Sequence, residues 1–269
     1  MTSPGAVAFS IFGIDIMWYG ILVGSGFILA VILSYIRAPK HGIQSDQIID
    51  LALWLIPLSI IGARAYYVIF EWENYSGDLA KILNIRGGGL AVHGELIVGL
   101  IVALVFCRRR KIPFLELTDL IFPHVAIAQS IGRWGNFFNS EAHGTATDLP
   151  WAILVDGQYV HPTFLYESIW CFCLFWFLLW MDRRRKFRGQ ITLLYGMLYS
   201  VERFCVEALR TDSLMIGPFR QAQVLSACVF ITCLVLYIYL NQKQRKEAEL
   251  ARAQSKKSNK RAKNHSKRA

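Results

Sequence analysis

A chain of 269 residues in which 54% are hydrophobic and only 18% are charged has the composition of a membrane protein. Its formal net charge of +10 would also suit a nucleic-acid-binding protein, but most of its 29 Lys and Arg residues flank long apolar runs or follow residue 241. This distribution indicates membrane topology and attraction to anionic lipid headgroups, so we do not expect a nucleic-acid partner.

Seven apolar runs reach the length of about 20 residues that spans the hydrocarbon core of a bilayer. In chain order they cover residues 14–36, 48–70, 89–107, 117–138, 163–181, 190–209 and 222–240. The first, third, fifth and seventh runs end in basic clusters, whereas the opposite loops hold only Lys81, Arg86, Arg210 and Arg220. By the positive-inside rule we expect an all-α polytopic membrane protein with its N-terminus outside and its C-terminus in the cytoplasm.

The domain organisation that we expect is one seven-helix transmembrane domain over residues 1–240, followed by a tail. Residues 139–162 form the longest outer loop, and its prolines and glycine suggest a small cap. The tail, residues 241–269, is basic and has no apolar periodicity after Leu240, which predicts a disordered cytoplasmic end. The N-terminus lacks the basic region and cleavage site of a signal peptide, so we expect the first span to remain in the mature protein.

Polar residues within the predicted spans gather near one depth. At 1.5 Å per residue, they lie within about 10–15 Å of the outer boundary. They are Tyr19, Arg64, His93, Arg133, Asn136, Tyr166, Glu167, Tyr199, Arg203 and Glu207. The inner half has little comparable apart from His124. Charged groups at such a depth are costly and usually mark function, so we expect a polar site close to the outer leaflet.

Two arginines on different helices, Arg133 and Arg203, would suit a phosphate, because each offers a planar fork of donors and stays charged. Tyr199, Arg203, Glu207 and Arg210 recur at spacings of four, four and three and should share one helix face. Glu207 could pair with Arg203 or with Arg210. Arg133 has Glu141 nearby in the sequence and otherwise remains available for an anionic ligand.

Several of these residues also have a purely structural interpretation. Arg203 and Glu207 could form an intramembrane ion pair, Tyr19 could belong to an aromatic belt, and His93 could be a packed histidine. The glycines at 87–89 could be only a flexible entry to a helix. The six cysteines lie in or beside apolar runs without a C-x-x-C pair, which predicts neither a disulfide framework nor a metal site. The common depth of the polar residues favours a functional role.

Residues 132–144, GRWGNFFNSEAHG, resemble the signature of the bacterial prolipoprotein diacylglyceryl transferases, G-R-x-G-N-F-x-N-x-E-x-x-G, at every defined position. Four further blocks resemble this family in the same order: WYG at 18–20, GGLAVHG at 88–94, HPTFLYE at 161–167 and YSVERFCVEALR at 199–210. The resemblance covers residues 14–240, and seven spans with the N-terminus outside also fit the family.

The resemblance implies transfer of the diacylglyceryl group of phosphatidylglycerol to the lipobox cysteine thiol of a prolipoprotein, with release of glycerol phosphate. This is the first step of lipoprotein maturation in the bacterial plasma membrane. The implied partners are phosphatidylglycerol, prolipoprotein signal peptides and membrane lipids, without a cofactor or metal, and we expect a multi-pass monomer.

The resemblance also implies roles for particular residues. The expected catalytic residues are Tyr19, His93, Arg133 and Arg203. Phosphatidylglycerol binding is expected of Arg133, Asn136, Asn139, Glu141, Gly144, Tyr199, Glu207 and Arg210. The two arginines would stabilise the departing phosphate, and His93 is a candidate base for the thiol.

Two positions depart from the family pattern. Glu95 stands where a small residue is expected and adds a carboxylate near His93, and His143 stands where an apolar or aromatic residue is common. Two other classes of function fit these residues less well. An anion transporter would use an arginine-lined layer but needs polar residues in both halves of the membrane, and a membrane scaffold does not account for a polar layer at one depth.

Overall fold

The computed structural model describes residues 2–85 and 88–266, with side chains described through Ala251. Arg86 and Gly87, named above, and residues 267–269 of the tail lie outside the described residues. The chain divides into two compact units. The first consists of Met1–Gly26 and Val125–Ala269, and the second of Phe27–His124. Each unit is described by itself.

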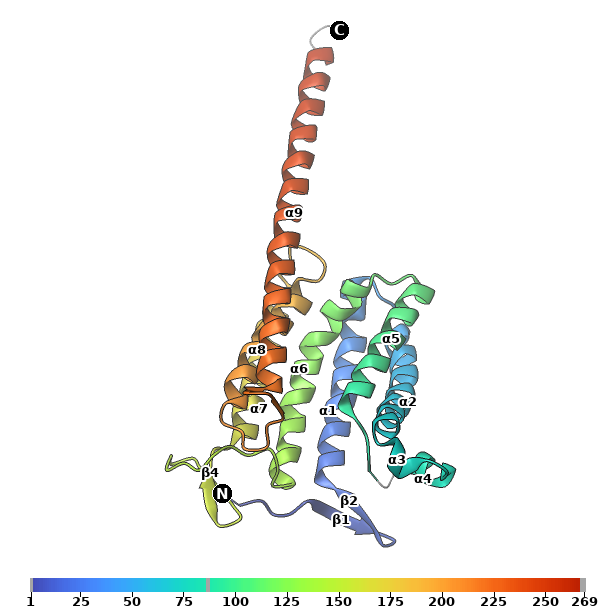
Figure 1. The fold of residues 1–269 in the computed structure, drawn as a ribbon. Helices are drawn as coiled ribbons and strands as arrows, with labels where there is room; N and C mark the ends of the chain where they lie inside the picture. Colours follow the sequence, from blue (N-terminus) through green and yellow to red (C-terminus); the bar gives the residue numbers. More distant parts are fainter. Residues whose placement is uncertain (1, 86–87, 267–269) are drawn as a thin grey trace. The chain divides into compact units, whose positions relative to one another are not determined.

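Every predicted apolar run coincides with a helix in the described part of the chain (Figure 1). These helices are α1 (Trp18–Arg37), α2 (Ser45–Phe70), α5 (Val92–Arg110), α6 (Phe114–Phe138), α7 (Thr163–Asp182), α8 (Gln190–Glu207) and α9 (Gln221–Ser266). Shorter helical turns form η1 (Ala38–His41), α3 (Trp72–Tyr75) and α4 (Leu79–Leu83). The protein is therefore mostly helical, as the sequence predicts.

Four helical segments of the described chain are long and apolar enough to cross a membrane. They are Trp18–His41, Ser45–Phe70, Thr163–Asp182 and Gln221–Ala251. Helices α5, α6 and α8 instead carry several charged residues, among them Glu95, Glu116 and Glu202. These four segments support a membrane protein, whereas the count of seven spans and the orientation of the termini stay predictions.

Three short antiparallel hairpins in the described residues depart from the all-α expectation. They pair β1 (Val7–Ile11) with β2 (Ile14–Met17), β3 (Ile153–Val155) with β4 (Gln158–Val160), and β5 (Met215–Ile216) with β6 (Phe219–Arg220). The loop residues of the first two, Phe12 and Gly13 and then Asp156 and Gly157, all have positive φ, as tight two-residue hairpin turns require. Because β2 takes residues 14–17, α1 begins at Trp18, later than predicted.

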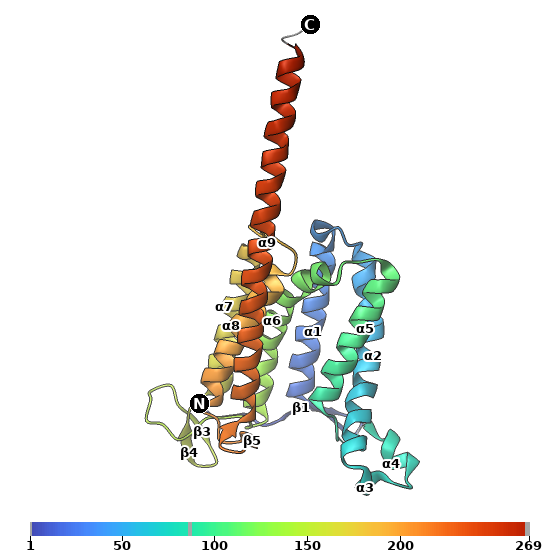
Figure 2. The same ribbon diagram turned by 45° about the horizontal axis from the view of Figure 1, so that its top comes forward.

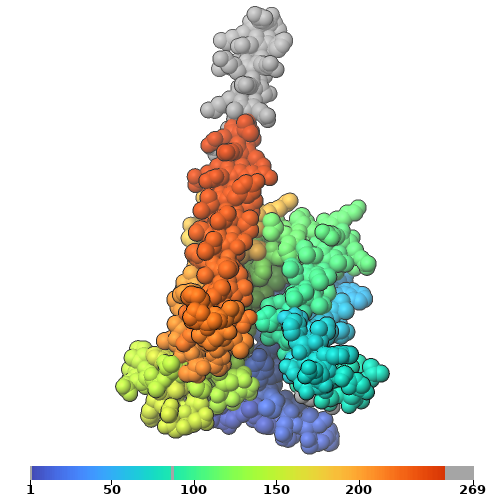
Figure 3. Space-filling view, in the orientation of Figure 1, coloured from blue at the N-terminus to red at the C-terminus, as the bar shows by residue number. Residues whose placement is uncertain are grey.

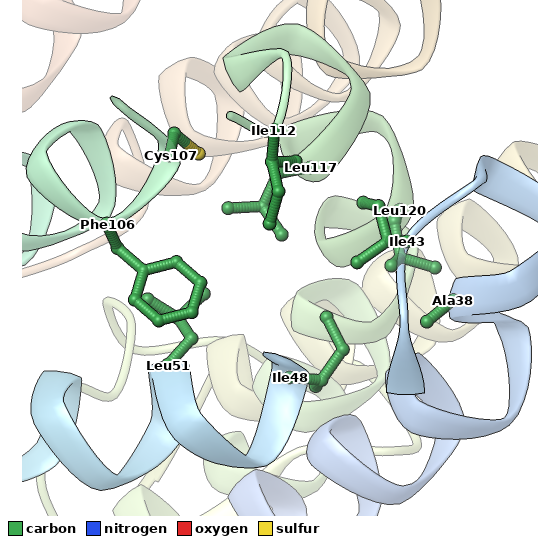
Figure 4. Close-up of a cluster of buried hydrophobic side chains, with 9 residues drawn as sticks. All are labelled: Ala38, Ile43, Ile48, Leu51, Phe106, Cys107, Ile112, Leu117 and Leu120. Atoms are coloured by element: carbon green, nitrogen blue, oxygen red, sulfur yellow. The ribbon is translucent and has the colours of Figure 1, made fainter. Parts of the chain in front are cut away.

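In the second unit, a hydrophobic cluster lies among α1, η1, α2, α5 and α6 (Figure 4). Its buried members are Ala38, Ile43, Ile48, Leu51, Phe106, Cys107, Ile112, Leu117 and Leu120. Helices α2 and α5 also meet at Gly62 and Gly94, where a β-carbon added to Gly62 would lie 2.9 Å from the Gly94 carbonyl oxygen. Small residues at such a contact let two helix backbones approach closely.

Buried polar side chains of the second unit bond to one another or to the backbone. Ser34 Oγ lies 2.8 Å from His124 Nδ1. His124, the polar residue predicted in the inner half of the spans, therefore has a side-chain partner. Arg64, in α2, donates from Nε to the Ile82 carbonyl at 2.9 Å and from Nη1 to the Gly88 carbonyl at 2.6 Å. Its guanidinium thus ties α2 to the segment that precedes α5.

In the first unit, α7, α8 and α9 run side by side, with α8 packed against both neighbours (Figures 1 and 2). Ser130 of α6 and Ser168 of α7 each donate a hydroxyl hydrogen bond of 2.8 Å to the other's carbonyl oxygen. Tyr195 of α8 donates a 2.8 Å hydrogen bond to Gln129 Oε1 of α6. These bonds hold α6, α7 and α8 at one rotation relative to each other.

The outer loop and the tail belong to this unit as well. Buried residues of the β3–β4 hairpin pack on Phe137 of α6 and Phe164 of α7, so part of the predicted cap is attached to the helices. Helix α9 continues beyond its apolar part to Ser266. Figure 3 shows its coloured part, which ends at Ala251, extending past the rest of its unit. The disorder predicted for residues 241–269 stays a prediction.

Candidate active site

Three helices of the first unit bring charged side chains together around one carboxylate. Glu167 Oε1, on α7, lies 3.2 Å from Arg133 Nη2 of α6 and 3.4 Å from Arg203 Nη1 of α8. The Glu167 side chain is 1% exposed, whereas each arginine side chain is 21% exposed. One buried carboxylate oxygen therefore serves two guanidinium groups, and their charge-assisted contacts orient both of them.

Two residues of α8 extend this cluster. Glu207 Oε2 lies 2.7 Å from Arg203 Nη2, four residues away on the same helix. Arg133 Nη2 donates a 3.3 Å hydrogen bond to the Tyr199 hydroxyl. The shared face of Tyr199, Arg203 and Glu207 is thus formed as the spacing predicts, and Glu207 pairs with Arg203 rather than with Arg210. We call Arg133, Glu167, Tyr199, Arg203 and Glu207 the arginine cluster.

The exposed part of the arginine cluster is cationic. The carboxylates of Glu167 and Glu207 are 1% and 3% exposed, so each lies beneath the guanidinium that it holds. A ligand that approaches the cluster meets guanidinium edges first. Because guanidinium groups present fixed forks of donors, this surface suits the oxygens of a phosphate or carboxylate.

A second polar group follows Arg133 in the sequence and consists of Asn136, Asn139 and Glu141. Glu141 Oε1 accepts hydrogen bonds from Asn136 Nδ2 at 2.9 Å and from Asn139 Nδ2 at 3.2 Å. The turn that makes this possible follows α6, where Ser140 and Ala142 have positive φ. Glu141 is therefore held by amides, and the acidic partner of Arg133 is Glu167 rather than its sequence neighbour Glu141.

Gly144 and Arg210 meet at an isolated antiparallel bridge between the outer loop and the segment after α8. The Gly144 N–H donates a 2.9 Å hydrogen bond to the His161 carbonyl, and a β-carbon added to Gly144 would lie 2.6 Å from His161 Cβ. Because Gly144 has no β-carbon, the backbone of the outer loop can lie this close to His161. Arg210 lies beyond the last residue of α8, which ends at Glu207, two residues before the predicted end of the span.

The Arg210 guanidinium forms a double contact with an acidic neighbour. Nε donates to Asp212 Oδ1 at 2.9 Å and Nη2 donates to Oδ2 at 2.6 Å. These hydrogen bonds hold the pKa of Asp212 below its ordinary value. The Arg220 guanidinium donates to the carbonyls of Glu207 and Arg210, the second at 3.1 Å. Its positive charge at the C-terminus of α8 also opposes the negative end of the helix dipole.

Tyr19 and His93 fall in different units. Tyr19, in the first turn of α1, lies over Gly135 of α6, where an added β-carbon would be 2.7 Å from Tyr19 Cδ2. It therefore belongs to the same unit as the arginine cluster. His93, in the first turn of α5, is exposed and stacks on Tyr66 with ring centroids 5.9 Å apart. It belongs to the other unit, so a common site with Arg133 stays a prediction.

The sequence alone predicts no specific role for Glu167 or Glu202. Glu167 is expected only as a member of the polar layer, although it ends the HPTFLYE block. Glu202 stands three residues after Tyr199 and one before Arg203, which places it on or next to the face that those residues share. Its side chain is 5% exposed. The helical spacing within residues 199–210 was a usable signal for Glu202.

Comparisons with known proteins agree with these observations. The family model described as "Prolipoprotein diacylglyceryl transferase" matches residues 6–239. A Finegoldia magna protein named phosphatidylglycerol–prolipoprotein diacylglyceryl transferase is 52% identical over 86% of this chain and 94% of its own length. Proteins with the same name from Clostridioides difficile and Synechococcus elongatus are 48% and 43% identical, over 89% and 88% of this chain and 96% and 89% of their own lengths.

Proposed function

Because the chain belongs to the prolipoprotein diacylglyceryl transferase family, we propose that it transfers the diacylglyceryl group of phosphatidylglycerol to the lipobox cysteine thiol of prolipoproteins. The products are a thioether-linked lipid and free glycerol phosphate. This reaction is the first step of bacterial lipoprotein maturation. The names of the relatives indicate the two substrates, phosphatidylglycerol and a prolipoprotein.

The observation that carries this function is the arginine cluster, whose guanidinium groups lie over buried carboxylates. In the reaction, the thiol sulfur attacks the lipid carbon that bears the phosphate oxygen. A sulfur–carbon bond forms, the carbon–oxygen bond breaks, and its electron pair moves to the phosphate. Arg133 and Arg203 hold the phosphate and stabilise the negative charge that develops on it, an effect that often dominates catalysis.

The remaining residues have supporting roles in this proposal. The thiol must lose its proton to become a strong nucleophile, and His93 is the proposed base. Tyr19 orients the reacting lipid. Phosphatidylglycerol is bound by Arg133, Asn136, Asn139, Glu141, Tyr199, Glu207 and Arg210, and Gly144 keeps the outer loop close to Arg210.

The proposed arrangement in the cell follows from the charges of the loops. We infer a multi-pass protein of the bacterial plasma membrane with seven spans within residues 1–240, the N-terminus outside and the basic residues 241–269 in the cytoplasm. This orientation places the arginine cluster near the outer leaflet, where a translocated signal peptide presents its cysteine. We propose that the enzyme acts as a monomer.

A direct assay tests the function. Purified protein in detergent is incubated with phosphatidylglycerol and a lipobox peptide, and the products are analysed by mass spectrometry. We expect a diacylglyceryl thioether peptide and an equal amount of glycerol phosphate, and no product from a control peptide with serine in place of the lipobox cysteine. Folded protein that forms neither product would refute the proposal.

A further inference from the structure

Glu202 is a buried acidic residue for which the reaction above provides no role. Its side chain is 5% exposed, and within the described part of the chain neither carboxylate oxygen has a hydrogen-bond partner. It lies on α8, three residues after Tyr199 and directly before Arg203, which are both members of the arginine cluster. A carboxylate with two unmet oxygens in such a place requires an explanation.

The pairing of charges within the arginine cluster makes the unmet oxygens of Glu202 harder to explain. Arg133 and Arg203 are already engaged by Glu167, and Arg203 is also engaged by Glu207. Within the described part of the chain, Glu202 is a third carboxyl group beside two paired guanidinium groups and forms no hydrogen bond with either of them. Burying a polar group without hydrogen bonds is unfavourable, and donors from a ligand would relieve that cost.

The ligand that supplies these donors must place them beside a phosphate. The phosphatidylglycerol headgroup does this, because its phosphodiester is followed by a glycerol with two hydroxyl groups. We propose that Glu202 accepts hydrogen bonds from these hydroxyls and thereby selects phosphatidylglycerol over phospholipids without them. The inference rests on the proposed function and adds a specificity-determining residue to it.

The test compares two lipids in the transfer assay. Phosphatidylglycerol is compared with phosphatidylpropanol, which keeps the phosphodiester and the three headgroup carbons but lacks both hydroxyls. For the unchanged protein we expect kcat/KM to favour phosphatidylglycerol by roughly tenfold or more, because hydrogen bonds to charged groups are strong. In Glu202→Met this ratio should fall close to one through loss of turnover with phosphatidylglycerol. Glu202→Gln should be intermediate, because its amide oxygen remains an acceptor.

Two further measurements separate recognition from a structural role. Thermal unfolding of Glu202→Met should be unchanged or shifted to higher temperature, because an unmet buried carboxylate has been removed. A structural role would instead lower the unfolding temperature and reduce turnover of both lipids equally, which would overturn the inference. Glu73→Gln, at an exposed position of α3, is the matched control and should keep the lipid preference.

Turnover by the unchanged protein separates a failure of the proposed function from a failure of the role of Glu202. If the unchanged protein forms no thioether with phosphatidylglycerol, the proposed function itself fails. If it does, and the lipid preference is the same in the unchanged protein, Glu202→Gln and Glu202→Met, only the role of Glu202 is overturned.

Discussion

Glu167 is the residue on which the geometry of the proposed phosphate site depends. Its Oε1 atom is shared by Arg133 and Arg203, which come from two other helices. Without this carboxylate, two cations would face each other in a partly buried site. The same atom therefore compensates their repulsion and sets the direction in which their remaining donors point.

We predict that Glu167→Gln lowers kcat/KM for lipid transfer roughly ten- to hundredfold and destabilises the protein by roughly 1.5–3 kcal/mol, the usual strength of hydrogen bonds to charged groups. The uncharged amide cannot hold both guanidinium groups. Transfer kinetics and thermal unfolding measure the two effects. The exposed Glu73→Gln should change neither, and wild-type kinetics in Glu167→Gln would contradict the shared-carboxylate interpretation.

Asp212 gives a prediction with a defined pH dependence. Hydrogen bonds from Arg210 hold its pKa in the folded protein below the ordinary value. A lowered pKa contributes stability above the unfolded-state value of about 3.9, and this contribution is lost as the pH falls through the folded-state pKa. The Asp212 side chain is 50% exposed, so solvent limits the effect to less than about 1 kcal/mol.

The expected result is therefore that Asp212→Asn lowers the unfolding temperature slightly at pH 7, and that its difference from the unchanged protein shrinks as the pH falls below about 4. Thermal unfolding across this pH range provides the measurement. Asp148→Asn, at an exposed position of the outer loop, serves as the control. A difference in unfolding temperature that grows toward acidic pH would contradict a lowered pKa of Asp212 in the folded protein.

At the scale of elements, the contact of α2 with α5 depends on two glycines. A β-carbon added to Gly94 would lie 2.9 Å from the Gly62 carbonyl carbon and would also meet Tyr66 Cβ. Because one of these neighbours is helix backbone, it cannot rotate away as a flexible side chain could. The two helices must separate to admit a larger residue, and His93 adjoins the contact.

We therefore predict that Gly94→Val destabilises the protein by about 1–3 kcal/mol, the typical cost of overpacking, and reduces transfer activity. Thermal unfolding in detergent measures the first effect. Gly24→Ala in α1 is the control, because a β-carbon there has no neighbour within 4 Å among the described residues and alanine favours helix more than glycine does. Equal stability of Gly94→Val and the unchanged protein would exclude close packing as the role of Gly94.

At the scale of the whole molecule, charge distribution carries the proposed orientation. Basic clusters follow α1, α5 and α7 and the apolar part of α9, and these ends share one side if consecutive long helices alternate in direction across a membrane. The residues of the arginine cluster lie near the C-terminal ends of α6 and α8 and the N-terminal end of α7, which are the helix ends away from these basic clusters. Orientation therefore decides on which side of the membrane the lipid would be modified.

Reporter fusions test this orientation. We expect a fluorescent protein fused after residue 241 to fluoresce, and alkaline phosphatase fused within residues 139–162 to be active, because the phosphatase folds only outside the cytoplasm. Alkaline phosphatase fused after residue 241 should stay inactive and is the control. Active phosphatase at the C-terminal position would contradict both an odd number of spans with an outside N-terminus and the cytoplasmic tail.

Hydropathy and motif spacing were enough to locate the long helices and to indicate the family that the chain resembles. Hydrophobic runs and helical spacing depend on residues close together in the chain, so α2, α6, α7 and α8 could be predicted to within a few residues. Motif spacing likewise identified Tyr199, Arg203 and Glu207 as one face. The positive-φ hairpin at Phe12 and Gly13 was missed, because its strand residues continue the apolar run of α1.

The pairing of the charged side chains, in contrast, is visible only in the folded protein. Arg133 pairs with Glu167 on another helix although Glu141 is nearer in the chain, and Glu202 is buried without a hydrogen-bond partner among the described residues. Such pairings depend on the rotation of each helix about its axis. Contacts between helices, such as the reciprocal hydrogen bonds of Ser130 and Ser168, set that rotation, and the local pattern of one helix does not contain it.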